Sequence, residues 1–316
     1  MNKIQGFHIN SPLSESLPMS RRLGTPVYLK MESSQPSGSF KIRGIGHLVQ
    51  QLAGPSSKGV ICSSGGNAGL ATAYAARKLS IPATIIVPSS SPRLVVEKLQ
   101  DLGAMVKVVG KVWDDAYAEA LRLSKSENLV LVPPFDHPLV WEGHTSIIRE
   151  LKASLPSRPG AVVLSVGGGG LFCGVMQGLD EVGWGDVPVL CMETHGADCL
   201  NAAIKAGRLV TLPDITSEAK CLGAKTACSK AFEYSKRPNI ISELVTDRQA
   251  LQAVELFLGT SLKSVNLLRA PTICPLLNSG MSPIMLCALQ YLEQNCALTL
   301  LIEPSHSALT GAIMCN

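Results

Sequence analysis

The chain has 316 residues, of which 46% are hydrophobic and 16% are charged, so it is long enough for one large or two medium domains and too apolar to be intrinsically disordered. Its formal net charge is only +4. No run of Lys and Arg is interleaved with aromatic residues, so we expect no nucleic-acid partner.

The amino-terminal stretch "MNKIQGFHINSPLSESL" lacks the apolar core of a signal peptide. The most apolar stretch, residues 283–302, is interrupted by Gln290, Glu293, Gln294 and Asn295, so we expect no membrane-spanning helix. Without an export signal, the ten cysteines are expected to be free thiols in a reducing compartment. Together these features predict a cytoplasmic protein.

Short β-rich runs alternate with helical patterns along the chain, which is typical of parallel βαβ units with helices on both faces of a sheet. We expect the first helix and the segment from about residue 45 to 140 to form a smaller lobe, with the carboxyl ends of the strands facing a crevice between the lobes. The predicted strands are residues 26–31, 59–64, 83–88, 105–110, 161–166 and 188–193. The predicted helices are residues 41–53, 67–79, 92–103, 114–126 and 171–183.

The loop "SSQPSGSFKIRGIG", residues 33–46, places Lys41 in the first turn of a predicted helix. The positive end of the helix dipole disfavours a charged lysine there, which favours the neutral, nucleophilic amine. The alternative is a turn that carries an ordinary solvated lysine.

The loop "SSGGNAG", residues 63–69, follows a predicted strand and begins a helix. Its backbone amides and the side chain of Asn67 are suited to an anion or to a ring oxygen. The alternative is a simple helix-capping loop.

The third loop is "GGGG", residues 167–170, again between a strand and a helix. Four glycines cost backbone entropy, which is explained if the backbone must approach a phosphate closely. The pattern fits neither the dinucleotide fingerprint nor the P-loop, so a smaller phosphorylated cofactor is favoured over a flexible turn. A lysine amine, an amide-rich loop and a phosphate loop together predict a phosphorylated aldehyde held by Lys41.

Cys191, Glu193, His195 and Cys199 form a loose group of possible metal ligands. Their spacing matches no common zinc pattern, so we expect them in the core or in loops.

Several long stretches closely resemble the animal L-serine/L-threonine dehydratases, and some are most similar to the serine dehydratase-like members of that family. The resemblance extends from about residue 7 to residue 257. It rests on "QPSGSFKIRGIGH", "CSSGGNAGLATAYAARKL", "LSVGGGGLFCGV", "EVGWGDVP", "METHGA", "GKVWDDA", "VPPFDHPLVWEGH" and "LVTLPDITSEAKCLGAKT".

The resemblance implies an α/β fold of the fold-type II pyridoxal-phosphate class, similar to the β subunit of tryptophan synthase, with two open, twisted, mostly parallel sheets flanked by helices. It implies a large cofactor-binding domain of residues 1–40 plus 141–316 and a small domain of residues 41–140.

The resemblance also implies the residues that bind pyridoxal 5'-phosphate. Lys41 would bind the cofactor aldehyde and later remove the substrate α-proton, while Phe40 would pack on the cofactor ring and Asn67 would bond the ring oxygen. The phosphate would be held by Gly167, Gly168, Gly169, Gly170 and Leu171.

The substrate carboxylate would be held by Ser64, Gly65 and Ala68. A monovalent cation, expected to be potassium, would bind the Glu193 carboxylate and the carbonyls of Ala197, Leu222 and Ala224, since hard oxygen ligands suit such an ion.

The activity implied by the resemblance is the elimination of water from small amino-acid substrates. L-Serine would give pyruvate and ammonia, and L-threonine would give 2-oxobutanoate and ammonia, in a homodimer. One alternative is a catalytically impaired, splice-type relative that binds the cofactor weakly. Other reactions of the fold, such as β-replacement and racemisation, are less favoured because "SSGGNAG" differs from the loops usual in cysteine synthases and racemases.

After residue 257 the resemblance fails until "IEPSHSALTGAIMCN", residues 302–316. We therefore interpret residues 258–300 as an atypical insert and expect the last strand of the large domain to be missing. That strand normally supplies the partner of the pyridine nitrogen. The alternative is that this region fills the strand's place, for which "LTLLI", residues 298–302, is the candidate.

Overall fold

The structure is a computed structural model that describes residues 6–53, 57–253 and 298–302. The chain divides into two compact units. The first unit comprises Met1–Ser11, Ser33–Glu150 and Gly174–Gly178, and the second comprises Pro12–Glu32, Leu151–Cys173 and Leu179–Asn316. The domain bounds expected from the sequence stay a prediction.

The elements follow one another as the alternating pattern predicts, with additional short elements at the start of the chain and after residue 130. The strands are β1 (Leu13–Glu15), β2 (Val27–Met31), β3 (Val60–Cys62), β4 (Ala83–Val87), β5 (Met105–Val108), β6 (Val130–Leu131), β7 (Ala161–Ser165), β8 (Val189–Thr194), β9 (Ile240–Val245) and β10 (Leu298–Ile302).

The α-helices are α1 (Leu17–Leu23), α2 (Lys41–Leu52), α3 (Asn67–Leu79), α4 (Arg93–Asp101), α5 (Trp113–Glu127), α6 (Pro138–His144), α7 (Ser146–Ser154), α8 (Gly170–Glu181), α9 (Cys199–Ala206) and α10 (Ser229–Tyr234). Two 3₁₀ turns, η1 (Glu32–Ser34) and η2 (Lys220–Leu222), complete the described elements.

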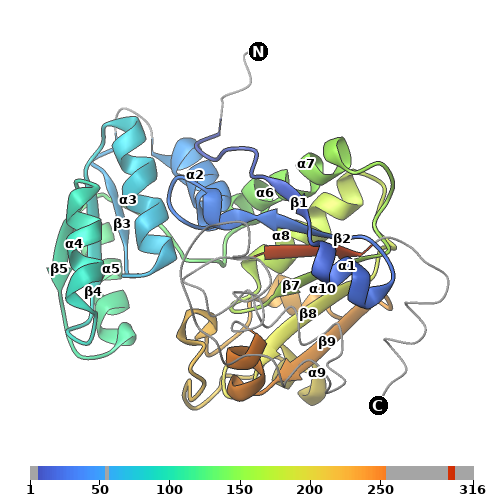
Figure 1. The fold of residues 1–316 in the computed structure, drawn as a ribbon. Helices are drawn as coiled ribbons and strands as arrows, with labels where there is room; N and C mark the ends of the chain where they lie inside the picture. The colour runs from blue at the N-terminus through green and yellow to red at the C-terminus, as the bar shows by residue number, and fades with distance from the viewer. Residues whose placement is uncertain (1–5, 54–56, 254–297, 303–316) are drawn as a thin grey trace, which may run out of the picture. The chain divides into compact units, whose positions relative to one another are not determined.

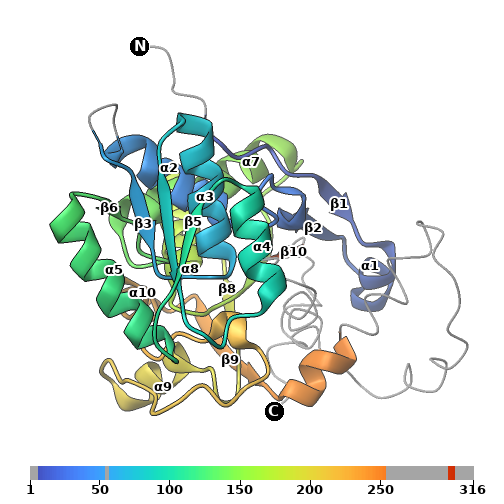
Figure 2. The same ribbon diagram turned by 90° about the vertical axis from the view of Figure 1, so that its left-hand side faces the viewer.

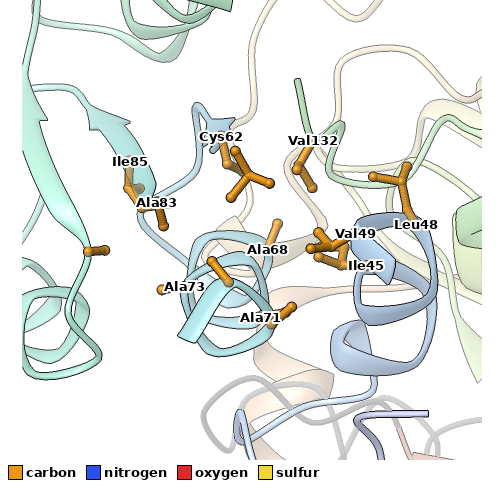
Figure 3. Close-up of a cluster of buried hydrophobic side chains, with 14 of the residues drawn as sticks. Ile45, Leu48, Val49, Cys62, Ala68, Ala71, Ala73, Ala83, Ile85 and Val132 are labelled. Carbon is orange, nitrogen blue, oxygen red and sulfur yellow. The ribbon is translucent and has the colours of Figure 1, made fainter. Parts of the chain in front are cut away.

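The first unit contains a four-stranded sheet of order β5-β4-β3-β6 in which every pair is parallel. Successive strand residues face opposite sides of this sheet. Cys62 and Ile85 pack with helices α2 and α3 on one side, and Figure 3 shows this cluster. Ile61 and Ile86 pack against α5 on the other side, and Figure 2 shows α5 across the sheet from α3 and α4. Burial on both faces explains why the inner strands β3 and β4 are almost entirely apolar, whereas the edge strand β5 carries Lys107 and is largely exposed.

The second unit contains a six-stranded sheet of order β1-β2-β10-β7-β8-β9. Strands β7, β8 and β9 pair in parallel. Strand β10 pairs antiparallel with both β2 and β7, so β2 runs in the same direction as β7. Only β1 and β10 run against the other strands of this sheet, and Figure 1 shows β10 in red beside β2.

Residues 298–302, "LTLLI", the candidate strand of the alternative interpretation, do form a strand, β10 (Leu298–Ile302). Its register aligns Leu300 with Leu29 on one side and with Val163 on the other. Strand β10 is therefore an inner strand that joins β2 to β7 in one sheet. The predicted insert at 258–300 lies outside the described residues except for its last three residues, and the absence of the family's final strand stays a prediction.

Candidate active site

Lys41 is the first residue of α2, as the sequence predicts, and Phe40 precedes it as the helix cap. The Lys41 Nζ donates a hydrogen bond to the carbonyl of Pro134 at 2.5 Å. The same nitrogen lies 5.4 Å from the centroid of the Phe40 ring. The side chain is partly buried and held by a distant carbonyl, which distinguishes it from the ordinary solvated lysine of the alternative interpretation.

Arg43, two residues after Lys41, joins α2 to α7 and to the amino-terminal segment of the first unit by hydrogen bonds. Its fully buried guanidinium forms a bidentate ion pair with Glu150, at 2.6 Å and 2.8 Å. Ser146 and Ser11 accept further hydrogen bonds from it. A buried arginine is tolerated when its donors are satisfied in this way, and the network fixes the helix that begins at Lys41.

His144 lies against Phe40, with the two ring centroids 5.1 Å apart. Glycines make room for it, since a Cβ on Gly44 would lie 2.7 Å from its ring and a Cβ on Gly174 would lie 2.3 Å from its own Cβ. Burial, together with the positive charges of Lys41 and Arg43, holds the pKa of His144 well below its usual 6.5. The imidazole beside the candidate site is therefore neutral.

Two polar atoms close to Lys41 in sequence or space have no hydrogen-bond partner among the described residues. They are the Ser39 Oγ and the His144 Nδ1, and both are buried. Buried polar atoms are normally paired, so these two suit a polar ligand. His144 and Pro134 were not predicted as site residues, and the only signal for them in the sequence is their place in the motif "VPPFDHPLVWEGH".

The second predicted loop leads into α3, which begins at Asn67. The N–H of Gly66 donates to the Ser64 Oγ at 3.3 Å, and a Cβ on Gly69 would clash with the Ser64 carbonyl oxygen. Gly69 is therefore required by the close approach of this loop to the helix. Ser64, Gly65 and Asn67 remain partly exposed at its surface, and Ala68 is buried beneath them. Their roles in binding stay predictions.

The third predicted loop, Gly167 to Gly170, joins β7 to α8 in the second unit. Its carbonyls are used internally: Gly168 accepts from the Cys228 N–H and Gly169 from the Cys173 N–H, each at 2.9 Å. Gly169 has a φ of +93°, which strongly favours glycine. The loop carbonyls are therefore occupied by protein donors. The first N–H groups of a helix have no acceptor within the helix, so the N–H groups at the start of α8 are suited to an anion.

Glu193 lies at the end of β8 and is buried. Its carboxylate accepts the N–H of Leu200 at 2.9 Å and the N–H of Asn201 at 2.8 Å. Burial raises the pKa of Glu193 to about 8 despite these two bonds.

The predicted carbonyl ligands lie in the same unit as Glu193. The Leu222 carbonyl accepts the Ala224 N–H at 2.6 Å, and a Cβ on Gly167 would lie 3.2 Å from the Leu222 Cα. The Ala197 N–H donates to the Thr194 carbonyl at 2.9 Å. The cation site itself stays a prediction.

Within residues 6–53, 57–253 and 298–302, no three His, Cys, Asp or Glu side chains gather in a way that holds a metal ion. Cys191 and Cys199 are buried, whereas His195 is exposed. None of the helices in the described part of the chain is long and apolar enough to cross a membrane.

Comparison with known families decides the class of this site. A family model described as "Pyridoxal-phosphate dependent enzyme" matches residues 4–262. The chain belongs to this family. The predicted cofactor, pyridoxal phosphate, is thereby supported, and the predicted lysine and glycine loop both lie within the matched region.

Two human relatives are similar over most of their length. The chain is 57% identical over 256 residues to "Serine dehydratase-like", covering 81% of this chain and 78% of the relative. It is 54% identical over 252 residues to "L-serine dehydratase/L-threonine deaminase", covering 79% of this chain and 77% of the relative. The predicted family resemblance is confirmed.

The crystal structure of a fungal L-serine ammonia-lyase from Rhizomucor miehei has a similar fold, with a TM-score of 0.77 and 37% sequence identity. The match covers 81% of this chain and 82% of the fungal chain. It confirms the predicted fold class, that of the fold-type II pyridoxal-phosphate enzymes.

The described residues fit this cofactor in both units. The first unit supplies a primary amine held in place at a helix start, with buried polar atoms without a partner on Ser39 and His144. The second supplies a glycine loop that has its carbonyls turned inward at the start of a twelve-residue helix. An amine suits an aldehyde and helix-start amides suit a phosphate. Their meeting in one crevice stays a prediction.

Proposed function

We propose that this protein eliminates water from L-serine to give pyruvate and ammonia, and from L-threonine to give 2-oxobutanoate and ammonia. The observation that carries the proposal is the identity of 57% and 54% to relatives named as serine dehydratase-like and L-serine dehydratase/L-threonine deaminase, over about four fifths of the chain. Further support comes from Lys41, a partly buried amine at the start of α2 whose Nζ is held by the Pro134 carbonyl.

Lys41 is proposed to bind the cofactor aldehyde and then to remove the α-proton of the substrate. Its Nζ donates a hydrogen bond to the Pro134 carbonyl, and this bond orients the amine. Pyridoxal phosphate, when bound, supplies an electron sink that stabilises the carbanion formed at the substrate α-carbon. The neutral imidazole of His144 adds no further positive charge near this amine.

The glycine loop is proposed to bind the cofactor phosphate. Amides at the start of α8, which begins at Gly170, would donate to this anion. Leu171, the second residue of α8, contributes its backbone N–H to the same set. Phe40 is proposed to cover the cofactor ring and Asn67 to bond its oxygen.

The loop before α3 is proposed to hold the substrate carboxylate through Ser64, Gly65 and Ala68. Support comes from the partial exposure of the first two residues at a helix start, where backbone dipoles favour an anion. Loss of the α-proton and of the β-hydroxyl, which leaves as water, gives a free enamine. The enamine then takes up one water and hydrolyses to the keto acid and ammonia.

We further propose a potassium site formed by Glu193 with the carbonyls of Ala197, Leu222 and Ala224. Support comes from the burial of Glu193, and from the short backbone turns at Ala197 and at Leu222–Ala224 in the same unit. Hard oxygen ligands suit such a cation.

We also propose a cytoplasmic homodimer that acts in amino-acid catabolism and supplies keto acids for gluconeogenesis.

The decisive experiment is to measure keto-acid release from L-serine and L-threonine by the purified full chain, with added pyridoxal phosphate and potassium. We expect pyruvate from serine, 2-oxobutanoate from threonine and an equal amount of ammonia. Formation of D-serine without ammonia would replace this proposal by racemisation. A protein that binds the cofactor weakly and releases no keto acid would instead be the impaired relative.

The cation assignment is tested by repeating the assay with sodium or tetramethylammonium in place of potassium, on the wild type and on Glu193→Gln. We expect potassium to activate the wild type and not the variant. The variant should also unfold at a somewhat lower temperature, because an amide offers only one acceptor oxygen to the N–H groups of Leu200 and Asn201. Equal activity of the wild type in all three salts would remove this site.

A further inference from the structure

Three cysteines hold three successive carbonyls of the glycine loop. The Cys199 Sγ donates to the Gly167 carbonyl at 3.4 Å. The backbone N–H of Cys228 donates to Gly168 and that of Cys173 donates to Gly169. Cys173 lies in α8, Cys199 begins α9 and Cys228 precedes α10. Three elements of the second unit therefore each donate one hydrogen bond to the loop through a cysteine.

Two of these cysteines also contact each other. The Sγ atoms of Cys173 and Cys228 lie 3.6 Å apart. Cys173 is in the first turn of α8 and Cys228 caps α10. Their exposed fractions are 0% and 2%. A disulfide has an S–S distance of about 2.05 Å, so the two sulfurs need to approach by only about 1.5 Å to form one.

The pair is tightly coupled to the loop. A Cβ placed on Gly169 would lie 3.3 Å from the Cys228 Sγ and 2.5 Å from the Cβ of Ala231 in α10. The loop therefore packs directly against Cys228 and the first turn of α10. Because packed interiors transmit strain, a movement that draws Cys173 and Cys228 together must shift the Gly168 and Gly169 carbonyls that their N–H groups hold.

We propose that Cys173 and Cys228 form a reversible disulfide that weakens the hold of the glycine loop on phosphate. The part that concerns phosphate rests on the proposed function. In the reduced state the two thiols pack without a covalent bond and the loop keeps the geometry described above. In the oxidised state the two helix starts that frame the loop are joined, and the loop amides lose their alignment on the anion.

The oxidant is a hydroperoxide, with hydrogen peroxide as the simplest case. One thiol loses its proton and its sulfur attacks a peroxide oxygen, which forms a sulfenic acid and releases water. The second sulfur then attacks the first, which forms the S–S bond and releases a second water. Two thiols and one hydrogen peroxide thus give one disulfide and two waters. A dithiol reductant reverses the change by thiol–disulfide exchange.

Both thiols are buried, so the oxidant must reach them when the loop opens. An anion bound to the loop amides keeps the loop closed and should protect the pair. The switch is therefore expected to respond more slowly in the protein loaded with pyridoxal phosphate than in the protein without it.

The test uses the purified full chain, treated with hydrogen peroxide and then mapped by mass spectrometry of unreduced peptides. Cys228→Ser and Cys173→Ser each remove one partner. Cys221→Ser is the matched control, because Cys221 is an exposed cysteine in the neighbouring turn η2. The dissociation constant for pyridoxal phosphate is measured before oxidation, after oxidation and after treatment with dithiothreitol.

We expect a peptide linked through Cys173 and Cys228 in the wild type and in Cys221→Ser, and not in the other two variants. Oxidation should raise the dissociation constant for pyridoxal phosphate by at least about tenfold, and dithiothreitol should restore it. Cys228→Ser should show no change in that constant on oxidation. Absence of the linked peptide, or its formation without a change in cofactor affinity, would overturn the proposal.

The two proposals fail in different ways. If the reduced protein bound no pyridoxal phosphate, the proposed function would fail. The switch would then be supported if the Cys173–Cys228 link formed and inorganic phosphate slowed its formation, and overturned if phosphate made no difference.

Discussion

The residues that we assign to cofactor binding are side chains in the first unit and backbone groups in the second. In the first unit the amine of Lys41 is held by a carbonyl, and the ring of His144 packs against Phe40. In the second unit Gly167 to Gly170 contribute no side chain, and the loop is shaped by hydrogen bonds to its carbonyls. The proposed roles therefore rest on side chains in the first unit and on backbone N–H groups in the second.

This difference determines how each unit responds to mutation. A side chain at the edge of a packed core can be removed while the backbone stays in place, so its chemistry can be tested alone. A backbone site cannot be altered without adding a Cβ or removing an N–H, and either change disturbs packing. Substitutions in the first unit should therefore change chemistry with little loss of stability, whereas substitutions in the glycine loop should change both.

The largest effect is expected from Lys41→Ala. It removes the only amine that we assign to the cofactor aldehyde, and the general base with it. Keto-acid release should fall by at least about a thousandfold, within the range for loss of an acid–base group. The visible absorbance of bound pyridoxal phosphate should also change, as recorded in a spectrum of the purified variant.

Lys58→Ala is the control for this substitution, because Lys58 is an exposed lysine of the same unit. It should leave both the rate and the spectrum unchanged. If Lys41→Ala kept the wild-type spectrum, another lysine would be the one that binds the cofactor.

The next effect concerns the backbone of β10. Leu300→Pro removes an N–H from a strand that pairs on both sides, with β2 and with β7. Proline inside a sheet removes a ladder hydrogen bond and is otherwise confined to edge strands. We expect a loss of about 3 kcal/mol or more in the free energy of unfolding, by analogy with proline inside a helix, and a fall in soluble yield.

Leu300→Val keeps the N–H and the β preference of the residue, so it should lose much less. Chemical denaturation of both variants measures the difference. Equal stability of Leu300→Pro and the wild type would show that residues 298–302 do not pair as β10.

Gly169→Ala tests the shape of the glycine loop. Alanine at a positive φ costs about 1–2 kcal/mol, and here its Cβ would also press on Ala231 at 2.5 Å. We expect a lower melting temperature and a dissociation constant for pyridoxal phosphate at least about tenfold higher.

Gly183→Ala separates strain from loop function. Gly183 also has a positive φ, of +76°, but a Cβ there would meet nothing within 4 Å. Gly183→Ala should lower the melting temperature only through the backbone strain of alanine at a positive φ, and it should leave the affinity for pyridoxal phosphate unchanged. If the two variants bound the cofactor equally well, the loop would not hold its phosphate.

The smallest effect is a pH dependence of stability from His144. The pKa of its imidazole is held well below 6.5 in the folded protein by burial and by the charges of Lys41, Arg43 and His8. Below pH 6.5 the unfolded chain takes up a proton that the folded protein does not. The free energy of unfolding should therefore fall as pH drops below 6.5, by up to about 1.4 kcal/mol per pH unit.

His144→Asn should remove this contribution to the slope, whatever its effect on the absolute stability. His195→Asn, which changes an exposed histidine, is the control. The measurement is denaturant unfolding between pH 7.5 and about pH 5. An identical slope in His144→Asn and the wild type would contradict the assignment.

Local features of the sequence predicted much of the fold. The helical period and the Gly-containing loops located α2, α3 and α8 to within one or two residues. Alternation of strands and helices predicted the parallel sheet of the first unit, because each strand there is joined to the next in the chain by a crossover that contains one α-helix. The three loops were found because glycine, serine and asparagine at helix starts have physical reasons that act locally.

The sequence by itself therefore determined the local elements, the three candidate loops and, through its long matching stretches, the family. Tertiary structure alone decided which partners these elements meet. Lys41 is held by a carbonyl 93 positions away, and β10 enters the sheet between β2 and β7. Cys173 meets Cys228 across 55 positions. No local pattern encodes such contacts, because each depends on two distant segments whose pairing is favourable only once the intervening chain has folded.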